Sequence, residues 1–258
     1  MEWISRMIFL NALLINLLFA FLGWLLSLRK NNVTHVDTMW SLFFVLDGLY
    51  FFSAFEPSSR SYLIMSLVLL WGMRLAIYLT YRNWGKPEDR RYLKIRQNNE
   101  PNFRYKSVYI IFGFQSILAW IIGSIIFMAI ENNHPLTWLD VLGFLVTLFG
   151  IGYESIADYQ LVRFKNDIKN HGKLLQSGLW KLSRHPNYFG EILVWWGFFI
   201  TTLSTGVHFN LIAPLLMTYL LLKFSGVTLL EANLIKKLNG YDDYQKKVNV
   251  IIPRFWKR

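Results

Sequence analysis

Cysteine is absent from the 258 residues of this chain, and charged residues make up only 17% of it. The lack of cysteine excludes a disulfide framework, thiolate chemistry, and zinc or iron–sulfur sites built on cysteine. No set of metal ligands is predicted, so any redox chemistry needs a bound organic cofactor. With 54% apolar and 17% aromatic residues, the composition also excludes an ordinary soluble domain. We therefore expect the chain to lie in a lipid bilayer.

Apolar runs of membrane length predict an all-α integral membrane protein with about seven transmembrane helices. The runs lie near residues 8–28, 39–55, 62–81, 108–130, 138–156, 188–205 and 210–230. The first run follows one basic residue, Arg6, and has no small-residue cleavage signature after it, so we expect an uncleaved membrane helix. No internal repeat or Pro-rich linker interrupts the pattern, which predicts a single domain over residues 1–258.

Lysine and arginine are concentrated in alternate loops. Apart from Arg6, Arg60 and Arg74, all of them lie in loops 29–37, 82–106 and 157–187 and in the tail 223–258. The positive-inside rule then predicts an outside N-terminus and a cytoplasmic C-terminus. Because this rule produces such a bias in any multispanning protein, the net charge of +11 indicates topology and not nucleic-acid binding. We expect a multi-pass protein of the bacterial inner membrane, with membrane lipids as partners and no nucleic acid.

Two charged residues fall inside the predicted spans. A charged group costs ~2.5–3.5 kcal/mol at the centre of a membrane helix on insertion scales, so each needs a partner or a water-filled cavity. At a rise of about 1.5 Å per residue, Asp47 and Arg74 lie at similar depths, roughly 12–15 Å below the cytoplasmic interface. Our hypothesis is that they form an ion pair or that Arg74 faces a cavity. The alternative is a purely structural tether between helices.

Further polar residues gather at the predicted cytoplasmic ends of the helices. Acidic groups there can hold ribose hydroxyls or a nicotinamide amide, while Lys and Arg can hold phosphates. This mixture favours a large anionic cofactor, although snorkelling and helix capping more often explain any one of these residues taken singly. The acidic members are Asp37, Glu154, Asp158, Glu191 and Glu231, and the loops add Asn83, Lys86, Arg163, Lys165, Lys173, Arg184 and His185.

The stretch SGLWKLSRHPNYFGE at 177–191 is more specific than its surroundings. Pro186 suits a first helical turn, and Ser183 or Asn187 can cap that helix. The unsatisfied amides at a helix N-terminus form an anion site, and here Arg184 and His185 flank it. Capping alone needs neither of these two residues, so the pattern favours ligand binding.

The segment SRHPNYFGE resembles a motif shared by steroid 5-alpha-reductases, sterol C14 reductases and isoprenylcysteine carboxyl methyltransferases. The whole chain is similar to a bacterial membrane-protein family of unknown function that is grouped with steroid 5-alpha-reductase C-terminal domains. The matching segments include VDTMW, WGMRLAIYL, RNWGKPEDRRY, ADYQLVRFK and GKLLQSGLWKLSRHPNYFGE.

This resemblance implies NADPH as cofactor and reduction of a carbon–carbon double bond in a steroid-, sterol- or polyprenyl-like lipid. It implies cofactor contacts from Arg74, Asn83, Lys86, Asp158, Lys165, Lys173, Asn187 and Glu191. The reductases polarise their substrate with a membrane glutamate and a tyrosine. Here the second predicted span has no Glu, and Trp71 stands near the tyrosine position. Tyr188, or Asp37 in a protonated form, is our candidate for the catalytic acid.

Two other functions remain open. An S-adenosylmethionine-dependent lipid or isoprenylcysteine-type methyltransferase fits the Arg-His-Pro-x-Tyr core and Glu231. A scaffold or lipid receptor fits a retained pocket that has lost its chemistry. The many cations in the two central loops favour NADPH, which has three phosphates, over S-adenosylmethionine, which has one carboxylate.

Overall fold

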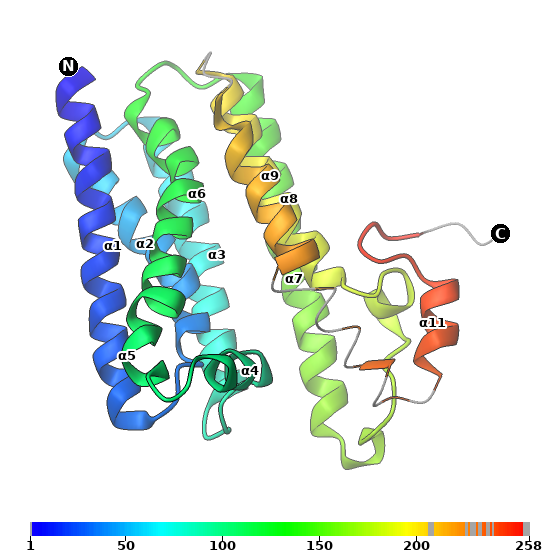
Figure 1. Ribbon diagram of the computed structural model, residues 1–258. Helices are drawn as coiled ribbons and strands as arrows, with labels where there is room; N and C mark the ends of the chain where they lie inside the picture. The colour runs from blue at the N-terminus through cyan, green and yellow to red at the C-terminus, as the bar shows by residue number, and fades with distance from the viewer. Residues whose placement is uncertain are drawn as a thin grey trace. The chain divides into compact units, whose positions relative to one another are not determined.

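The chain forms a helical protein in the computed structural model, which describes residues 2–205, 209–224, 227, 231, 234–235, 238 and 240–254. All regular secondary structure in these residues is helical (Figure 1). The predicted all-α class is therefore confirmed. The chain divides into two compact units, Met1–Thr137 and Trp138–Arg258. A single domain over 1–258 stays a prediction.

Four of the described helices are long and apolar enough to cross a membrane, which indicates an integral membrane protein. They are Glu2–Lys30 (α1), Ser59–Asn83 (α3), Phe103–Glu131 and Trp138–Asn166 (α7). The other predicted spans also lie on helices as far as the structure describes them: α2 (Val36–Ala54), α8 (Pro186–Leu203), and α9 (Ile212–Tyr219) with the π-helical turn Leu220–Phe224. Positions 225–226 and 228–230 of the last predicted span lie outside the described residues. The total of seven spans and the orientation of the termini stay predictions.

In the first unit, α2 contacts α1, α3 and α6 (Phe114–Glu131), and α1 also contacts α6. Aromatic rings fill the contacts between these helices. Phe127 of α6 lies 5.1 Å from the ring of Phe9 and 5.2 Å from the ring of Phe51. Two short helices, α4 (Arg90–Asn99) and α5 (Phe103–Ser107), lie at the end of this bundle where α1 ends (Figure 1). The π-helical segment Val108–Gly113 connects α5 to α6.

In the second unit, α7 and α8 approach each other so closely that their backbones touch. A Cβ atom added at Gly150 would lie 2.7 Å from the carbonyl oxygen of Gly190, and one added at Gly197 would lie 2.7 Å from the amide of Thr147. Glycine permits this approach, which is a common form of helix packing in membranes. It brings the C-terminal half of α7 beside the first turns of α8.

The length of α7 differs from the prediction. The predicted span ended at residue 156 and placed Glu154 and Asp158 at a helix end, which is wrong because α7 continues to Asn166. Residues 157–166 contain neither glycine nor proline, so nothing in the backbone terminates the helix there. Glu154 and Asp158 are consequently buried on a continuous helix.

The second unit also holds the last helix, α11 (Tyr241–Lys247), and two 3-10 turns, Ile168–Asn170 and Gly178–Lys181. The segment after α11 pairs with the segment before α8. The amides of Arg184 and His185 donate to the carbonyls of Asn249 (2.9 Å) and Val250 (3.1 Å), and the amide of Arg254 donates to Leu182 (3.0 Å). These bonds fix the chain just before α8 begins.

Candidate functional site

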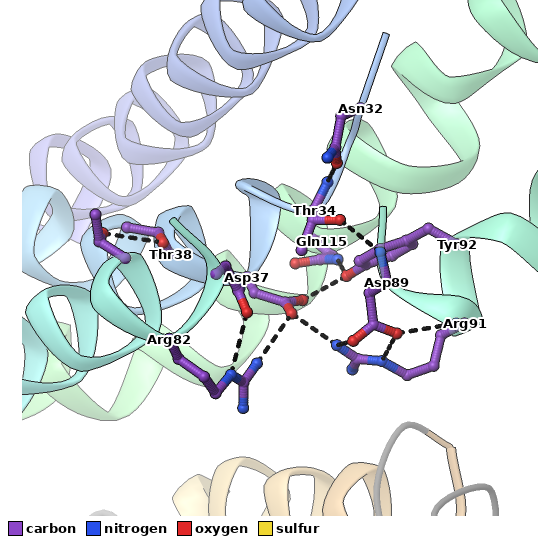
Figure 2. Close-up of polar contacts among 11 residues, drawn as sticks. Asn32, Thr34, Asp37, Thr38, Arg82, Asp89, Arg91, Tyr92 and Gln115 are labelled. Carbon is purple, nitrogen blue, oxygen red and sulfur yellow. Dashed lines mark hydrogen bonds and ion pairs between the residues drawn. The ribbon is translucent and has the colours of Figure 1, made fainter. Parts of the chain in front are cut away.

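Asp37, at the start of α2, is the centre of a polar network in the first unit (Figure 2). Its carboxylate accepts a hydrogen bond from Arg91 Nη2 at 2.6 Å and another from the Tyr92 hydroxyl at 2.6 Å. Arg82 Nη2, from the end of α3, lies 3.5 Å away. Gln115 of α6 donates to the Tyr92 hydroxyl at 3.2 Å. The network therefore joins α2, α3, α4 and α6.

Asp89 adds a second carboxylate to this network and caps α4. It accepts from the Arg91 amide at 2.9 Å and from Arg91 Nε at 3.0 Å, while its own amide donates to Thr34 Oγ1. Burial opposes ionisation of Asp89, but the hydrogen bond and charge of Arg91 lower its pKa. Burial and the charge of Asp37 raise the pKa of Tyr92, so this phenol stays a hydrogen-bond donor. Arg91 is thus the cation that both carboxylates share.

These contacts differ from the environment expected for a protonated Asp37. Each partner of the Asp37 carboxylate in this network is a donor, and two of the donors are guanidinium groups. Such a set suits an ionised carboxylate that accepts hydrogen bonds. The observed contacts therefore favour a positioning function for Asp37 over proton donation.

The other predicted residues of the first unit lie on α3 and in the loop that follows it. Asn83 ends α3, and its Oδ1 accepts from Arg82 Nε at 3.2 Å. Its Nδ2 is buried and has no hydrogen-bond partner among the described residues. Lys86 is exposed in the next turn, which requires a positive φ of 67° at Gly85.

Arg74 lies within α3 and is half-buried. The structure gives its expected partner, Asp47, a different contact: Asn16 Nδ2 of α1 donates to Asp47 Oδ2 at 3.1 Å. The Asp47 side chain is thus tied to α1 and not to Arg74.

In the second unit, the close contact of α7 and α8 brings four predicted residues together. Glu154, Asp158 and Glu191 are all buried, with 3%, 3% and 5% of their surface exposed. Asn187 Nδ2 donates to Asp158 Oδ1 at 3.3 Å, and Trp195 Nε1 donates to Glu191 Oε1 at 3.2 Å. The result is a buried set of acceptors at the start of α8.

Arg184 and His185 bind residues of the chain itself. Arg184 holds Glu231 through Nε (2.7 Å) and Nη2 (3.1 Å), and its Nη1 donates to the carbonyls of Gln245 and Val248. His185 Nε2 lies 3.0 Å from Glu231 Oε1. Burial opposes ionisation of Glu231, but hydrogen bonds from His185 and Arg184 lower its pKa to about 2. Two of the residues that we predicted for a cofactor, Arg184 and His185, thus bind groups of the chain itself.

The start of α8 is built differently from the predicted cap. His185 is the N-cap residue, Pro186 begins the helix, and the His185 side chain makes no capping hydrogen bond with the described part of the chain. Ser183 donates instead to the carbonyl of Val250 at 3.2 Å, and Asn187 bonds Asp158. The ring of Tyr188 stacks on His185 at a centroid distance of 5.4 Å. Neither of the side chains that we predicted as caps therefore caps the N-terminus of α8.

The two predicted cations of the intervening loop region, Lys165 at the end of α7 and Lys173, are exposed. Within the second unit the structure thus brings Asp158 to Asn187, and brings Arg184 and His185 to Glu231, while leaving these two lysines at the surface.

Comparison with known proteins gives the family. A family model described as "Protein of unknown function (DUF1295)" matches residues 23–248. The chain belongs to this family. The match confirms the resemblance to the steroid 5-alpha-reductase-like membrane proteins.

Curated relatives of this DUF1295 protein include one that matches most of the chain. An uncharacterized protein of Schizosaccharomyces pombe is 28% identical over 281 residues, which covers 95% of this chain and 80% of the relative. The steroid 5-alpha-reductase DET2 of Gossypium hirsutum is 35% identical over 74 residues, or 29% of each chain. DET2 of Arabidopsis thaliana is 32% identical over 82 residues, or 31% of each chain. No solved structure matches.

Sequence reasoning missed the residues that hold Asp37. Arg91 and Tyr92 belong to the RNWGKPEDRRY segment, but they were not predicted as site residues. The sequence contained one indication of these contacts: an acidic residue stands before one predicted span, and basic residues follow the next predicted span. It does not identify which of several arginines makes the contact.

Proposed function

We propose that this DUF1295 protein is a membrane reductase that uses NADPH to reduce a carbon–carbon double bond of a lipid substrate, steroid-, sterol- or polyprenyl-like. The observation that carries the proposal is the polar cluster where α7 meets the start of α8, in which Asp158 and Glu191 are buried and Asn187 donates to Asp158. Family membership and the partial similarity to steroid 5-alpha-reductases support the same reaction class.

Each unit, taken by itself, has residues that suit groups of a dinucleotide. In the second unit, carboxylates such as Asp158 and Glu191 accept hydrogen bonds from ribose hydroxyls or a carboxamide. In the first unit, the buried Asn83 Nδ2 has no hydrogen-bond partner among the residues that the structure describes, and it is available to an oxygen of the cofactor. Lys86 and Lys173 are exposed and suit phosphate groups. The bound cofactor supplies the hydride.

The chain has two further tasks in this scheme. Tyr188, whose ring is held against His185, is our candidate donor of a hydrogen bond to the oxygen on which negative charge develops. Arg184 and Glu231 act as positioning residues, because their mutual contacts fix the backbone that leads into α8. The apolar substrate enters from the surrounding lipid.

The test is a titration of the purified protein in mild detergent with NADPH and, separately, with S-adenosylmethionine, followed by thermal shift. We expect NADPH alone to raise the melting temperature, since a ligand that binds only the folded state stabilises it. Stabilisation by S-adenosylmethionine alone would instead favour the methyltransferase. Stabilisation by neither would favour a scaffold or lipid receptor.

Single lysine variants sharpen this test. Loss of one phosphate contact in Lys173→Gln should weaken NADPH binding about tenfold, which corresponds to ~1.4 kcal/mol. Lys181→Gln is the matched control, because Lys181 is also an exposed lysine of the same loop and has no predicted contact. Equal NADPH affinity in the two variants would contradict the phosphate assignment of Lys173.

A further inference from the structure

A polar pair lies in the apolar core of the first unit, where the proposed function uses neither residue. Asn16 is near the middle of α1 and Asp47 is in the second half of α2. Their exposed fractions are 0% and 1%. Asn16 Nδ2 donates to Asp47 Oδ2 at 3.1 Å, which joins the two helices.

Each partner has one side-chain oxygen to which no described residue donates a hydrogen bond. Asn16 Oδ1 and Asp47 Oδ1 are both buried, and neither has a hydrogen-bond partner among the described residues. If Asp47 were ionised, both of these oxygens could only accept hydrogen bonds. A buried acceptor left without a donor costs free energy, and an ionised carboxylate in hydrocarbon costs much more.

No cation among the described residues makes a hydrogen bond or ion pair with Asp47. Away from the ends of α1, α2, α3 and α6, the only charged side chains are Asp47 and Arg74. Asp47 makes its hydrogen bond with Asn16, not with Arg74. On the α6 side it meets Gly123, where an added Cβ would lie only 2.8 Å from Asp47 Oδ2. The contact is too close for a bulky counter-ion on that face.

We propose that Asp47 binds a proton and forms a neutral acid–amide pair with Asn16 inside the membrane. A proton on Oδ1 turns an unused acceptor into a donor, and Asn16 Oδ1 is the unused acceptor that it can reach by rotation of the two side chains. One bound proton thus supplies the donor that the pair lacks and removes the buried charge. This assignment does not depend on the proposed reductase activity.

Infrared spectroscopy of the protein in lipid nanodiscs tests the proposal directly. The wild type should show a carbonyl band of a protonated carboxyl group that Asp47→Asn lacks. In Asn16→Leu the same band should move to higher frequency, because its hydrogen bond is lost. This second variant keeps the test valid if Asp47→Asn does not fold. A wild-type spectrum without a protonated carboxyl band assigned to Asp47 would overturn the proposal.

Melting temperatures provide an independent measurement. An amide at position 47 is neutral and can return the same hydrogen bond, so Asp47→Asn should melt within about 2 °C of the wild type. Asp47→Leu removes the interhelical bond and should melt roughly 1–7 °C lower. The outcome that contradicts a bound proton is a sodium-dependent rise in the wild-type melting temperature, relative to choline, that Asp47→Asn abolishes.

Discussion

The close contact of α7 and α8 predicts a difference in melting temperature between alanine variants at two glycines of α7. Gly150 faces α8, and a Cβ added there would meet Gly190 O at 2.7 Å and Val194 N at 2.8 Å. Both distances are well below the 3.4 Å at which ordinary contact begins, and both partners are backbone atoms that cannot rotate away. Gly152, two residues further along α7, has nothing within 4 Å of its added Cβ. Gly150→Ala and Gly152→Ala are therefore matched variants.

The expected difference in stability comes from the one effect that the two variants do not share. Both gain about 1 kcal/mol of helix propensity, so this gain cancels in the comparison. Overpacking of a tight contact costs typically 1–3 kcal/mol, and only Gly150→Ala incurs that cost. At ~2–4 °C per kcal/mol for a chain of this size, Gly150→Ala should melt roughly 2–12 °C below Gly152→Ala.

The assay is thermal unfolding of both variants in one detergent, with NADPH titration of each folded protein. We expect Gly150→Ala to bind NADPH more weakly as well, because separating the helices moves Asp158 away from Asn187. Identical melting temperatures for the two alanine variants would refute the close backbone contact on which this reasoning rests.

Three further predictions concern the polar clusters. Because contacts in the fold lower the pKa of Glu231 from its ordinary value of 4.5 to about 2, their stabilisation is complete above pH 4.5 and is lost as the pH falls towards 2. The difference in melting temperature between wild type and Glu231→Gln should shrink over this range, and a constant difference would contradict the shift. Asp37→Asn should reduce the free energy of unfolding by about 1–3 kcal/mol, since two arginines lose their carboxylate, whereas the exposed Asp243→Asn should change it by less than about 0.5 kcal/mol. Tyr92→Phe should cost less than Asp37→Asn in the same denaturation assay, because both guanidinium contacts with Asp37 remain.

Much of the helical fold follows from composition alone. A bilayer accepts long apolar segments only as hydrogen-bonded helices or closed barrels, so the apolar runs locate α1, α3 and α7 directly. The end of α7 could not be read from hydropathy, because the helix continues as a polar segment to Asn166. Hydropathy shows where the segment in contact with lipid ends. The helix itself ends where its backbone hydrogen bonds end.

The candidate site was harder to predict because its contacts join distant parts of the chain. The bond from Tyr92 to Asp37 spans 55 residues, and that from Arg184 to Glu231 spans 47. Local sequence indicated correctly that polar groups gather at the start of α8. Its suggestion that Arg184 serves a ligand stays a prediction; in the structure this side chain holds Glu231 and two carbonyls. Whether such a side chain contacts another residue of the chain or a ligand depends on the tertiary structure.

The pairing of residues 182–185 with residues 249–254 has a consequence for biosynthesis. The carbonyl of Val248 that accepts a hydrogen bond from Arg184 is 64 residues further along the chain, so a ribosome must translate past residue 248 before that bond can form. Helix α8 can enter the bilayer during translation, but the backbone in front of it gains its final shape only afterwards. Translation that stops before residue 248 should therefore leave an inserted protein whose α8 start is unfinished.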